Sequence, residues 1–246
     1  MLSKSRITLI TSLKQKKYRT QHGLFVVEGI KTINEFLNSS YELEHLYTLS
    51  GFENLSSDKQ TLITESQLRR ISFFKNTNSA LALFKIEPSK AIDESKLIVA
   101  LDNVRDPGNL GTIIRLCDWF GVTDLVCNLG TVDCYNSKVV QATMGSLTRV
   151  NVTYVNLKDY LINQIDVPVY GTFMNGENLY TSSITPNKGV LVLGNEANGI
   201  SNEIEALVSR KLTIPKFGET QQTESLNVAM ATSILLSEFK RQTIVP

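Results

Sequence analysis

The sequence is short of the residues that build disulfide frameworks and metal sites. Its 246 residues include three cysteines (Cys117, Cys127 and Cys134) and no Cys-x-x-Cys pair, so neither a disulfide framework nor a zinc site is expected. The two histidines, His22 and His45, are not clustered with the cysteines and are expected to be ordinary surface or packing residues. These shortages favour a reduced, cytoplasmic protein without a resident metal ion.

Long apolar runs are also missing. No stretch approaches the roughly 18 consecutive apolar residues of a membrane-spanning helix, and the first 20 residues lack the apolar core of a secretory signal. Hydrophobic residues make up 42% of the chain and charged residues 20%, which excludes a disordered, collagen-like or coiled-coil protein. The composition predicts a globular protein of one large domain or two modest ones, with no membrane partner.

Net charge is nearly absent, at +1, but this average conceals an asymmetry. Residues 1–96 hold 14 Lys and Arg against 10 Asp and Glu, whereas residues 97–246 hold 11 against 14. Most of the excess lies in residues 1–31, where Glu28 is the single acidic residue. Such a basic arm can contact the phosphates of a nucleic acid, or it can be a solvated terminal helix whose lysines contact nothing.

The chain changes character near residue 90, which predicts two domains. Before that point the expected elements are short, among them an apolar strand at 24–29 and a helix at 30–40. Pro88 and the polar stretch after it are typical of a linker, so we place the boundary at residue 92. Residues 1–92 are then a small α/β module, and residues 93–246 form the second domain.

From residue 97 onward, apolar strands alternate with helices. Helices are expected near 109–120 and 225–241, and strands such as 97–102 and 189–194 are almost continuously apolar. This pattern predicts a parallel sheet with helices on both faces. Because ligands of such sheets bind beyond the carboxyl ends of the strands, the residues that follow the strands are the candidates for a functional site.

The first of three polar segments begins with a turn at residues 106–108, after which Asn109 is expected to cap a helix. Arg115 lies in that helix among apolar neighbours, so its charge calls for either a partner or a function. A salt bridge to Asp118 or Asp124 is the structural alternative to a functional role.

The second segment, residues 189–201, runs from an apolar strand into Gly194 and Glu196. Glycine there lets the backbone approach a ligand closely, although a tight structural turn explains it equally well. The segment lacks the Gly-Lys-Ser/Thr of a phosphate-binding loop and the G-x-G-x-x-G of a dinucleotide site.

In the third segment, a short strand ends at Ile214 and a polar loop leads to Ser225, which is expected to cap the final helix. The small residues Ala229, Ala231 and Ser233 allow another backbone to pack closely against this helix. That backbone belongs either to the core of the same chain or to a second copy.

In their order and spacing, the three segments resemble the signature motifs of the SpoU (TrmH-type) RNA 2′-O-ribose methyltransferases of the SPOUT superfamily. The matching sequences are DPGNLGTIIR followed by FGV, then LVLGNEANGIS, then IP followed by ESLNVAMA. The resemblance covers residues 97–242. The early FVVEGIKTINEFL also resembles the L30e-like substrate-binding domain that many members carry.

The resemblance implies an α/β fold of the SPOUT type, in which the carboxyl-terminal chain forms a trefoil knot, preceded by a small L30e-like α/β RNA-binding domain. The knot loops of the family hold S-adenosylmethionine, and family members work as homodimers without a metal. The positions that match the family's cofactor contacts are Thr172, Gly194, Ile214 and Leu226.

The polar site residues of the family match Asn109, Arg115, Glu196, Ser225 and Asn227. The reaction moves a methyl group from a sulfonium to a ribose 2′-hydroxyl, a poor nucleophile until its proton leaves. The family assignment makes Arg115 the base; alternatively, Arg115 stays charged and stabilises the developing alkoxide. Glu196 would orient Arg115 or a substrate hydroxyl, and the two asparagines would position the reactants.

The resemblance also implies RNA contacts in the first domain, on Lys14, Lys16, Lys17, Arg19 and Lys31. The reaction selects RNA because DNA lacks the 2′-hydroxyl, and the extra domain favours structured ribosomal RNA over transfer RNA. One departure from the family is the loop between Ile214 and Ser225, which is a few residues longer than usual.

Two rival functions remain to be compared with this one. A non-catalytic RNA-binding or assembly factor would keep the fold but carry a broken motif, and all three polar clusters are intact here. A nucleotide-binding metabolic enzyme on an open α/β sheet would carry a phosphate-loop or dinucleotide fingerprint, and the sequence has neither.

Overall fold

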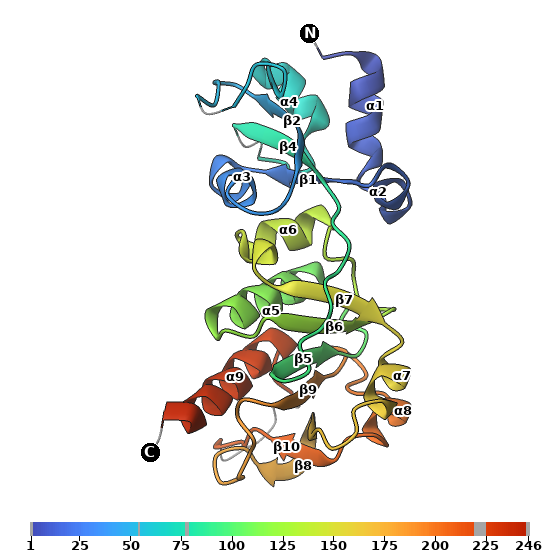
Figure 1. Cartoon of the computed structure of the whole chain (residues 1–246), viewed down its shortest axis with the longest axis vertical. Helices are drawn as coiled ribbons and strands as arrows, with labels where there is room; N and C mark the ends of the chain where they lie inside the picture. Colours follow the sequence, from blue (N-terminus) through green and yellow to red (C-terminus); the bar gives the residue numbers. More distant parts are fainter. Residues whose placement is uncertain (1, 54, 77–78, 219–224, 245–246) are drawn as a thin grey trace. The chain divides into compact units, whose positions relative to one another are not determined.

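The computed structural model describes residues 2–53, 55–76, 79–218 and 225–244, which form two compact units (Figure 1). The first unit contains Met1–Pro88 and Asp133–Thr148, and the second contains Ser89–Val132 and Arg149–Pro246. The first break in the chain, after Pro88, lies close to the boundary expected at residue 92. The sequence pattern does not predict that residues 133–148 belong to the first unit.

A four-stranded sheet with strand order β1-β4-β2-β3 forms the centre of the first unit. Strand β4 pairs antiparallel with β1 and β2, whereas β3 pairs parallel with β2. Apolar side chains of α1, β1, α4 and β4 form one buried cluster beside it. The elements are α1 (Lys4–Ser12), α2 (Lys16–His22), β1 (Leu24–Glu28), α3 (Ile30–Leu37), β2 (Leu43–Thr48), β3 (Gln60–Leu62), α4 (Glu65–Ile71) and β4 (Ala80–Lys85).

The later segment of the first unit carries α6 (Ser137–Thr143) and the 3₁₀ turn η1 (Ser146–Thr148). Its Tyr135 ring lies 4.6 Å from the Phe25 ring, centroid to centroid, in the core beside β1. Gly145 has a φ of +96°, and a Cβ built on it would lie 2.6 Å from Glu35 Cγ. Aromatic packing and this close approach explain why a segment so distant in sequence belongs to the unit.

Arg19 is buried in the first unit, with its side chain 4% exposed. Its Nε donates to Asp133 Oδ2 at 3.0 Å, and its Nη2 bonds the same oxygen. Its Nη1 donates to the carbonyl oxygens of Leu13 at 2.9 Å and Lys14 at 3.0 Å. The prediction that Arg19 contacts RNA is therefore wrong: a buried guanidinium needs such partners, and this one has used its donors within the fold.

The second unit is built on a six-stranded sheet with strand order β10-β8-β9-β5-β6-β7, in which every recorded pairing is parallel. This confirms the predicted parallel sheet. The elements are β5 (Leu97–Leu101), α5 (Pro107–Trp119), β6 (Asp124–Asn128), β7 (Asn151–Val155), α7 (Leu157–Ile162), β8 (Val169–Asn178), β9 (Gly189–Leu193), α8 (Asn202–Glu205), β10 (Arg210–Thr213) and α9 (Val228–Ile244).

Helices cover both faces of this sheet, as the alternation of its side chains shows. Val169 packs with Leu157 of α7 and Ile204 of α8 in one buried cluster. The next residue, Tyr170, points to the opposite face and meets Phe239 of α9 edge-on, with 5.2 Å between the ring centroids. Helix α9 also packs against α5. Within the described residues, no helix is both long and apolar enough to cross a bilayer.

The Arg19–Asp133 pair generates a stability prediction. Replacing Arg19 with Ala leaves the largely buried Asp133 carboxylate without its partner, which we expect to cost on the order of 3–5 kcal/mol. Thermal and urea unfolding of the whole chain measures this loss. The matched control is Lys17→Ala, which removes an exposed cation from the same helix and should change stability by about 0.5 kcal/mol or less. Equal melting temperatures for the two variants would contradict the anchoring role.

Candidate functional site

The loops that follow β5 and β9 form the candidate site at the carboxyl edge of the second sheet. In this sheet, β6 and β7 lie on one side of β5, and β9, β8 and β10 lie on the other side. Adjacent β5 and β9 end level with each other, since Leu101 pairs with Leu193 and Asp102 N donates to Leu193 O at 2.9 Å. A parallel sheet binds ligands beyond such a point of reversal.

The loop after β5 leads into α5 through a cap that differs from the one predicted. Asp106 is the N-cap, since its Oδ1 accepts a hydrogen bond from Asn109 N at 2.8 Å, and Pro107 takes the first helical position. Proline suits that position because its missing N–H would have no helical partner. Asn109 is therefore inside the first turn, and its side chain is available for contacts outside the helix.

Glu196, in the loop after β9, receives hydrogen bonds from this helix start. Asn109 Nδ2 donates to Glu196 Oε1 at 3.0 Å, and the backbone N–H groups of Arg105 and Asp106 donate to its two oxygens at 3.3 Å. Partial burial raises the pKa of Glu196, but these hydrogen bonds outweigh it and hold the pKa below its usual range. Glu196 is thus an ionised acceptor at the amino end of α5, where a negative charge is favoured.

Asn227 joins the third segment to the other two. Its Nδ2 donates to Asn109 Oδ1 at 2.9 Å, so a chain of hydrogen bonds runs from Asn227 through Asn109 to Glu196. Its Oδ1 accepts from the N–H groups of Ala229 at 2.9 Å and Met230 at 3.3 Å, which makes Asn227 the cap of α9. The structure brings these three predicted site residues together.

Ser225 is not the helix cap that the sequence predicts. Helix α9 begins at Val228, and Ser225 lies exposed two residues before Asn227. The amide oxygen of Asn227 already accepts the first N–H groups of the helix, which leaves the Ser225 hydroxyl outside the cap.

The loop from Gly194 to Gly199 is a closed turn. Asn195 and Gly199 exchange two backbone hydrogen bonds of 2.9 Å, and Asn195 Oδ1 accepts from Ala197 N at 2.9 Å. A Cβ on Gly194 would lie 2.2 Å from the carbonyl carbon of Gly199, which no side chain permits. Gly194 is therefore required by a tight structural turn. Some of the backbone groups that we expected to face a ligand form hydrogen bonds within the loop instead.

Asp102 is a positioning residue that the sequence reasoning did not select. It is 1% exposed; its Oδ1 accepts from Asn103 Nδ2 at 2.8 Å and Asn128 Nδ2 at 3.1 Å, and its Oδ2 from Ser201 N at 2.8 Å. One buried carboxylate thus ties together the ends of β5 and β6 and the end of the Glu196 loop. The sequence feature that could have identified Asp102 is its position directly after a fully apolar strand.

Arg115 is exposed on α5, and it forms no ion pair or hydrogen bond with the side chains that the structure describes. The predicted salt-bridge alternative is wrong, because Asp118 pairs instead with Arg149 at 2.9 Å. Asp124 accepts from Thr123 and Asn151. Arg115 also lies outside the Asn227–Asn109–Glu196 chain, so it is a charge left available to a ligand.

Three of the predicted cofactor positions lie on adjacent strands of the sheet, one of them within β8 and the other two directly after β9 and β10. Thr172 comes after Gly171, the last β8 residue paired with β9, while Gly194 follows β9 and Ile214 follows β10. Leu226, 50% exposed, immediately precedes the Asn227 cap. Among described residues, the backbones of Gly194, Ile214 and Leu226 receive and donate no hydrogen bond. Unused N–H and C=O groups at neighbouring strand ends fit the edge of an adenine, which such groups can pair with.

Most of the longer loop expected between Ile214 and Ser225 lies outside the described residues.

The remaining predicted RNA contacts lie on the surface of the first unit. Lys14, Lys16, Lys17 and Lys31 are all exposed. The Lys14 ammonium lies 5.0 Å from the centroid of the Phe73 ring, and that of Lys17 lies 5.9 Å from the Tyr18 ring. These four side chains, unlike Arg19, can reach a polyanion.

The small residues of α9 do not form one outward face. Ala229 is 3% exposed and Thr232 is fully buried, so this side of the helix packs within its own chain. Of the two alternatives, the structure shows the first for Ala229, which packs within its own chain. The apolar side chains that do reach the surface include Trp119 of α5, 84% exposed, and Met230 of α9, 59% exposed.

Comparisons with known proteins agree with this geometry. The model of the SpoU rRNA Methylase family matches residues 96–237, and that of the MRM3-like substrate binding domain matches residues 4–82. The 23S rRNA (guanosine(2553)-2'-O)-methyltransferase RlmP of Bacillus subtilis is 30% identical over 234 residues, which are 93% of each chain.

Solved structures match along almost the whole chain. A protein described as an RNA methyltransferase of the TrmH family from Porphyromonas gingivalis is 38% identical, with a TM-score of 0.88 over 98% of this chain and 99% of that one. An AdoMet-bound rRNA methyltransferase from Sinorhizobium meliloti is 28% identical, with a TM-score of 0.85 over 98% and 97% of the two chains. These matches confirm the resemblance and, of the predicted fold class, the α/β fold with a parallel sheet and the preceding substrate-binding domain.

The lowered pKa of Glu196 predicts how its contribution to stability depends on pH. A carboxylate whose pKa is depressed by folding stabilises the fold above its unfolded pKa, about 4.3 for Glu, and loses this effect as the pH falls through the folded value. At neutral pH the wild-type protein should therefore have a higher melting temperature than Glu196→Gln. This gap between the two melting temperatures should close as the pH falls below about 4. Glu65→Gln, which removes an exposed pair with Arg69, is the control and should show a small gap throughout. A Glu196 gap that does not change with pH would contradict the assignment.

Proposed function

Because the chain belongs to the SpoU rRNA methylase family, we propose that it transfers a methyl group from S-adenosylmethionine to a ribose 2′-hydroxyl of ribosomal RNA. The observation that carries this proposal is the hydrogen-bond chain from Asn227 through Asn109 to Glu196. It unites the three signature motifs at the carboxyl edge of the sheet, where the fold binds ligands. A retired, non-catalytic relative would have no need to preserve both hydrogen bonds.

The choice of ribosomal RNA rests on the relatives that match along most of the chain. RlmP of Bacillus subtilis is named as a 23S rRNA 2′-O-methyltransferase, and the Sinorhizobium meliloti neighbour is an rRNA methyltransferase. The first unit matches a substrate binding domain, which agrees with an RNA contact there by Lys14, Lys16, Lys17 and Lys31. The proposed place of action is the cytoplasm, and the proposed functional domains are those expected at 1–92 and 93–246, with residues 133–148 packed into the first unit.

S-adenosylmethionine supplies an electrophilic methyl group on a sulfonium sulfur. We place it against Thr172, Gly194, Ile214 and Leu226, because the unused backbone groups of Gly194, Ile214 and Leu226 suit an uncharged adenine edge. The AdoMet-bound neighbour from Sinorhizobium meliloti supports this cofactor. The family's trefoil knot belongs to the same proposal, since it would shape these loops.

The proton of the 2′-hydroxyl must leave during transfer, and the environment of Glu196 argues against that carboxylate as the base. Its pKa is held low, and its oxygens already accept hydrogen bonds from Asn109 and from two backbone N–H groups. Arg115, in the first of the three motifs, is a charged side chain that forms no ion pair or hydrogen bond with the described side chains. Its role is to accept the proton or, remaining charged, to stabilise the developing alkoxide. Asn109, Asn227 and Ser225 position the reactants.

Two copies of the chain form the proposed working unit. Trp119, the one tryptophan of the sequence, is 84% exposed at the end of α5, and Met230 is 59% exposed on α9, which packs against α5. Large apolar side chains on neighbouring helices are typical of a surface that a partner covers. We therefore assign the contact to this pair of helices and not to Ala229.

Methyl transfer is tested with radiolabelled S-adenosylmethionine and ribosomal RNA that lacks the modification. We expect label in alkali-resistant dinucleotides, which 2′-O-methylation creates, and none in DNA. Arg115→Ala and Arg115→Lys should both lose about 10²- to 10⁴-fold in single-turnover rate, because lysine lacks the planar fork of the guanidinium.

The control for Arg115 is Arg149→Lys, which keeps a cation beside Asp118 and should retain wild-type turnover. Melting temperatures and cofactor binding by calorimetry should be the same in all variants. An Arg115→Lys enzyme within a few-fold of wild type would remove Arg115 from the mechanism, and label found on bases would overturn the 2′-hydroxyl as acceptor.

The proposed dimer is tested by sedimentation velocity at micromolar concentration. The wild-type chain of 27.4 kDa should sediment as a dimer, and Trp119→Glu should shift it toward the monomer because a buried, unpaired charge opposes association. Ile165→Glu places the same charge on a side chain that is 78% exposed elsewhere in the second unit, and it should remain dimeric. A monomeric wild type would refute the assignment.

A further inference from the structure

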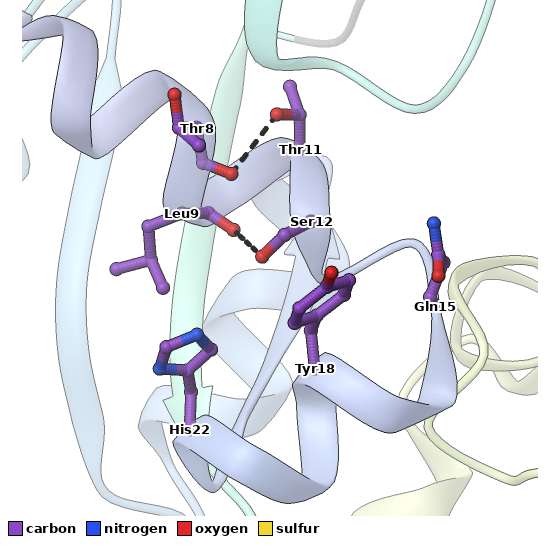
Figure 2. A pocket seen from close by; sticks show the side chains of 7 residues that line it. All are labelled: Thr8, Leu9, Thr11, Ser12, Gln15, Tyr18 and His22. Carbon is purple, nitrogen blue, oxygen red and sulfur yellow. Dashed lines mark hydrogen bonds between the residues drawn. The ribbon is translucent and has the colours of Figure 1, made fainter.

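An open pocket of about 500 Å³ lies between α1 and α2 in the first unit (Figure 2). Tyr18 and His22 are four residues apart on α2 and therefore share one face of the helix. Figure 2 shows both rings reaching from α2 toward α1, where Leu9 and Ser12 form the other side. The full lining is Thr8, Leu9, Thr11, Ser12, Gln15, Tyr18 and His22.

The hydroxyl groups of α1 do not offer protons to a ligand in this pocket. Thr8, Thr11 and Ser12 each donate to a carbonyl oxygen of their own helix, at 3.1, 2.8 and 2.7 Å respectively. By contrast, the side chains of Gln15, Tyr18 and His22 form no hydrogen bond with any residue that the structure describes. The pocket thus combines two aromatic faces with unused polar groups at their edges.

Positive charge lies beside the pocket, and the two helices that line it carry no carboxylate. Residues 1–27 contain no Asp or Glu. Lys14, just before α2, and Lys16 and Lys17, in its first turn, are exposed, and the Lys17 ammonium lies 5.9 Å from the centroid of the Tyr18 ring. Buried Arg19 ties α2 to Asp133, so the helix that presents these side chains is held in place.

Aromatic faces beside a row of cations are the means by which proteins bind single-stranded nucleic acid: bases stack on the rings and phosphates meet the cations. We propose that the α1–α2 pocket binds one unstacked base of single-stranded RNA on Tyr18, with His22 and Gln15 at its edge and the flanking phosphates on Lys14, Lys16 and Lys17. This proposal rests on the proposed function for its choice of RNA. It assigns to the first unit the recognition of an unpaired nucleotide in the substrate.

The test uses the full chain and a fluorescent single-stranded RNA of about 10 nucleotides, within the site size of single-strand binders, with the same sequence as a duplex. Tyr18→Leu keeps apolar volume but removes the aromatic face, and it should weaken single-strand binding by about 5- to 100-fold. Duplex binding should be unchanged, because paired bases are already stacked. Tyr18→Phe keeps the ring and should bind within about twofold of wild type.

Two further variants separate stacking from charge. Replacing Lys14, Lys16 and Lys17 with Ala should flatten the salt dependence of binding for both RNAs, whereas Tyr18→Leu should leave that slope unchanged. Leu62→Ala, which trims a side chain that is 63% exposed on β3, is the matched control and should bind as wild type does. Melting temperatures confirm that each variant is folded.

The experiments distinguish an error in the proposed base-binding pocket from an error in the proposed methyltransferase function. If Tyr18→Leu binds single strands like wild type while the wild type methylates ribosomal RNA, the pocket is overturned and the enzyme is not. A loss of duplex binding equal to the loss of single-strand binding would also overturn stacking on Tyr18. If the wild type transfers no methyl group but binding still depends on Tyr18, the pocket is supported and the enzymatic function fails.

Discussion

The amide side chain of Asn109 links parts of the chain that are about ninety to one hundred and twenty residues apart in sequence: its nitrogen donates to Glu196, and its oxygen accepts from Asn227. An amide suits this position because it is a donor and an acceptor at once. The link requires Asp106, and not Asn109, to cap α5, since capping would occupy the side chain. Asn109 thus contacts both the loop after β9 and the start of α9.

The same contacts divide the chemical roles in the site. Glu196 is saturated with hydrogen bonds and its pKa is lowered, so it is suited to hold a geometry and poorly suited to accept a proton. Asp102, buried behind it, fixes the ends of two strands and the far end of the Glu196 loop. Arg115 is exposed and free of ion pairs among the described residues, which leaves it for the substrate. The two hydrogen-bonded carboxylates thus hold the loops, and the cation is left for the substrate.

The two basic side chains that the sequence cannot tell apart, Arg19 and Lys17, have opposite roles in the first unit. Arg19 is 4% exposed and bonds Asp133 and two carbonyl groups, so it stabilises the fold. Lys17 is exposed beside Tyr18 and is available to phosphate. Because Asp133 comes from a segment that the sequence pattern places with the second domain, the buried pair is also part of what assembles the first unit.

The sequence by itself determined the parallel sheet, the family and the residue types of the site, because apolar strands and motif spacing are local properties of the chain. It did not determine which residue caps each helix, since Asp106, Asn109, Ser225 and Asn227 all have capping side chains. It also did not reveal that Arg19 is buried, that Asp118 pairs with Arg149, or that Ala229 packs inward. Those outcomes depend on partners distant in sequence, and only the tertiary structure brings such partners within hydrogen-bond distance.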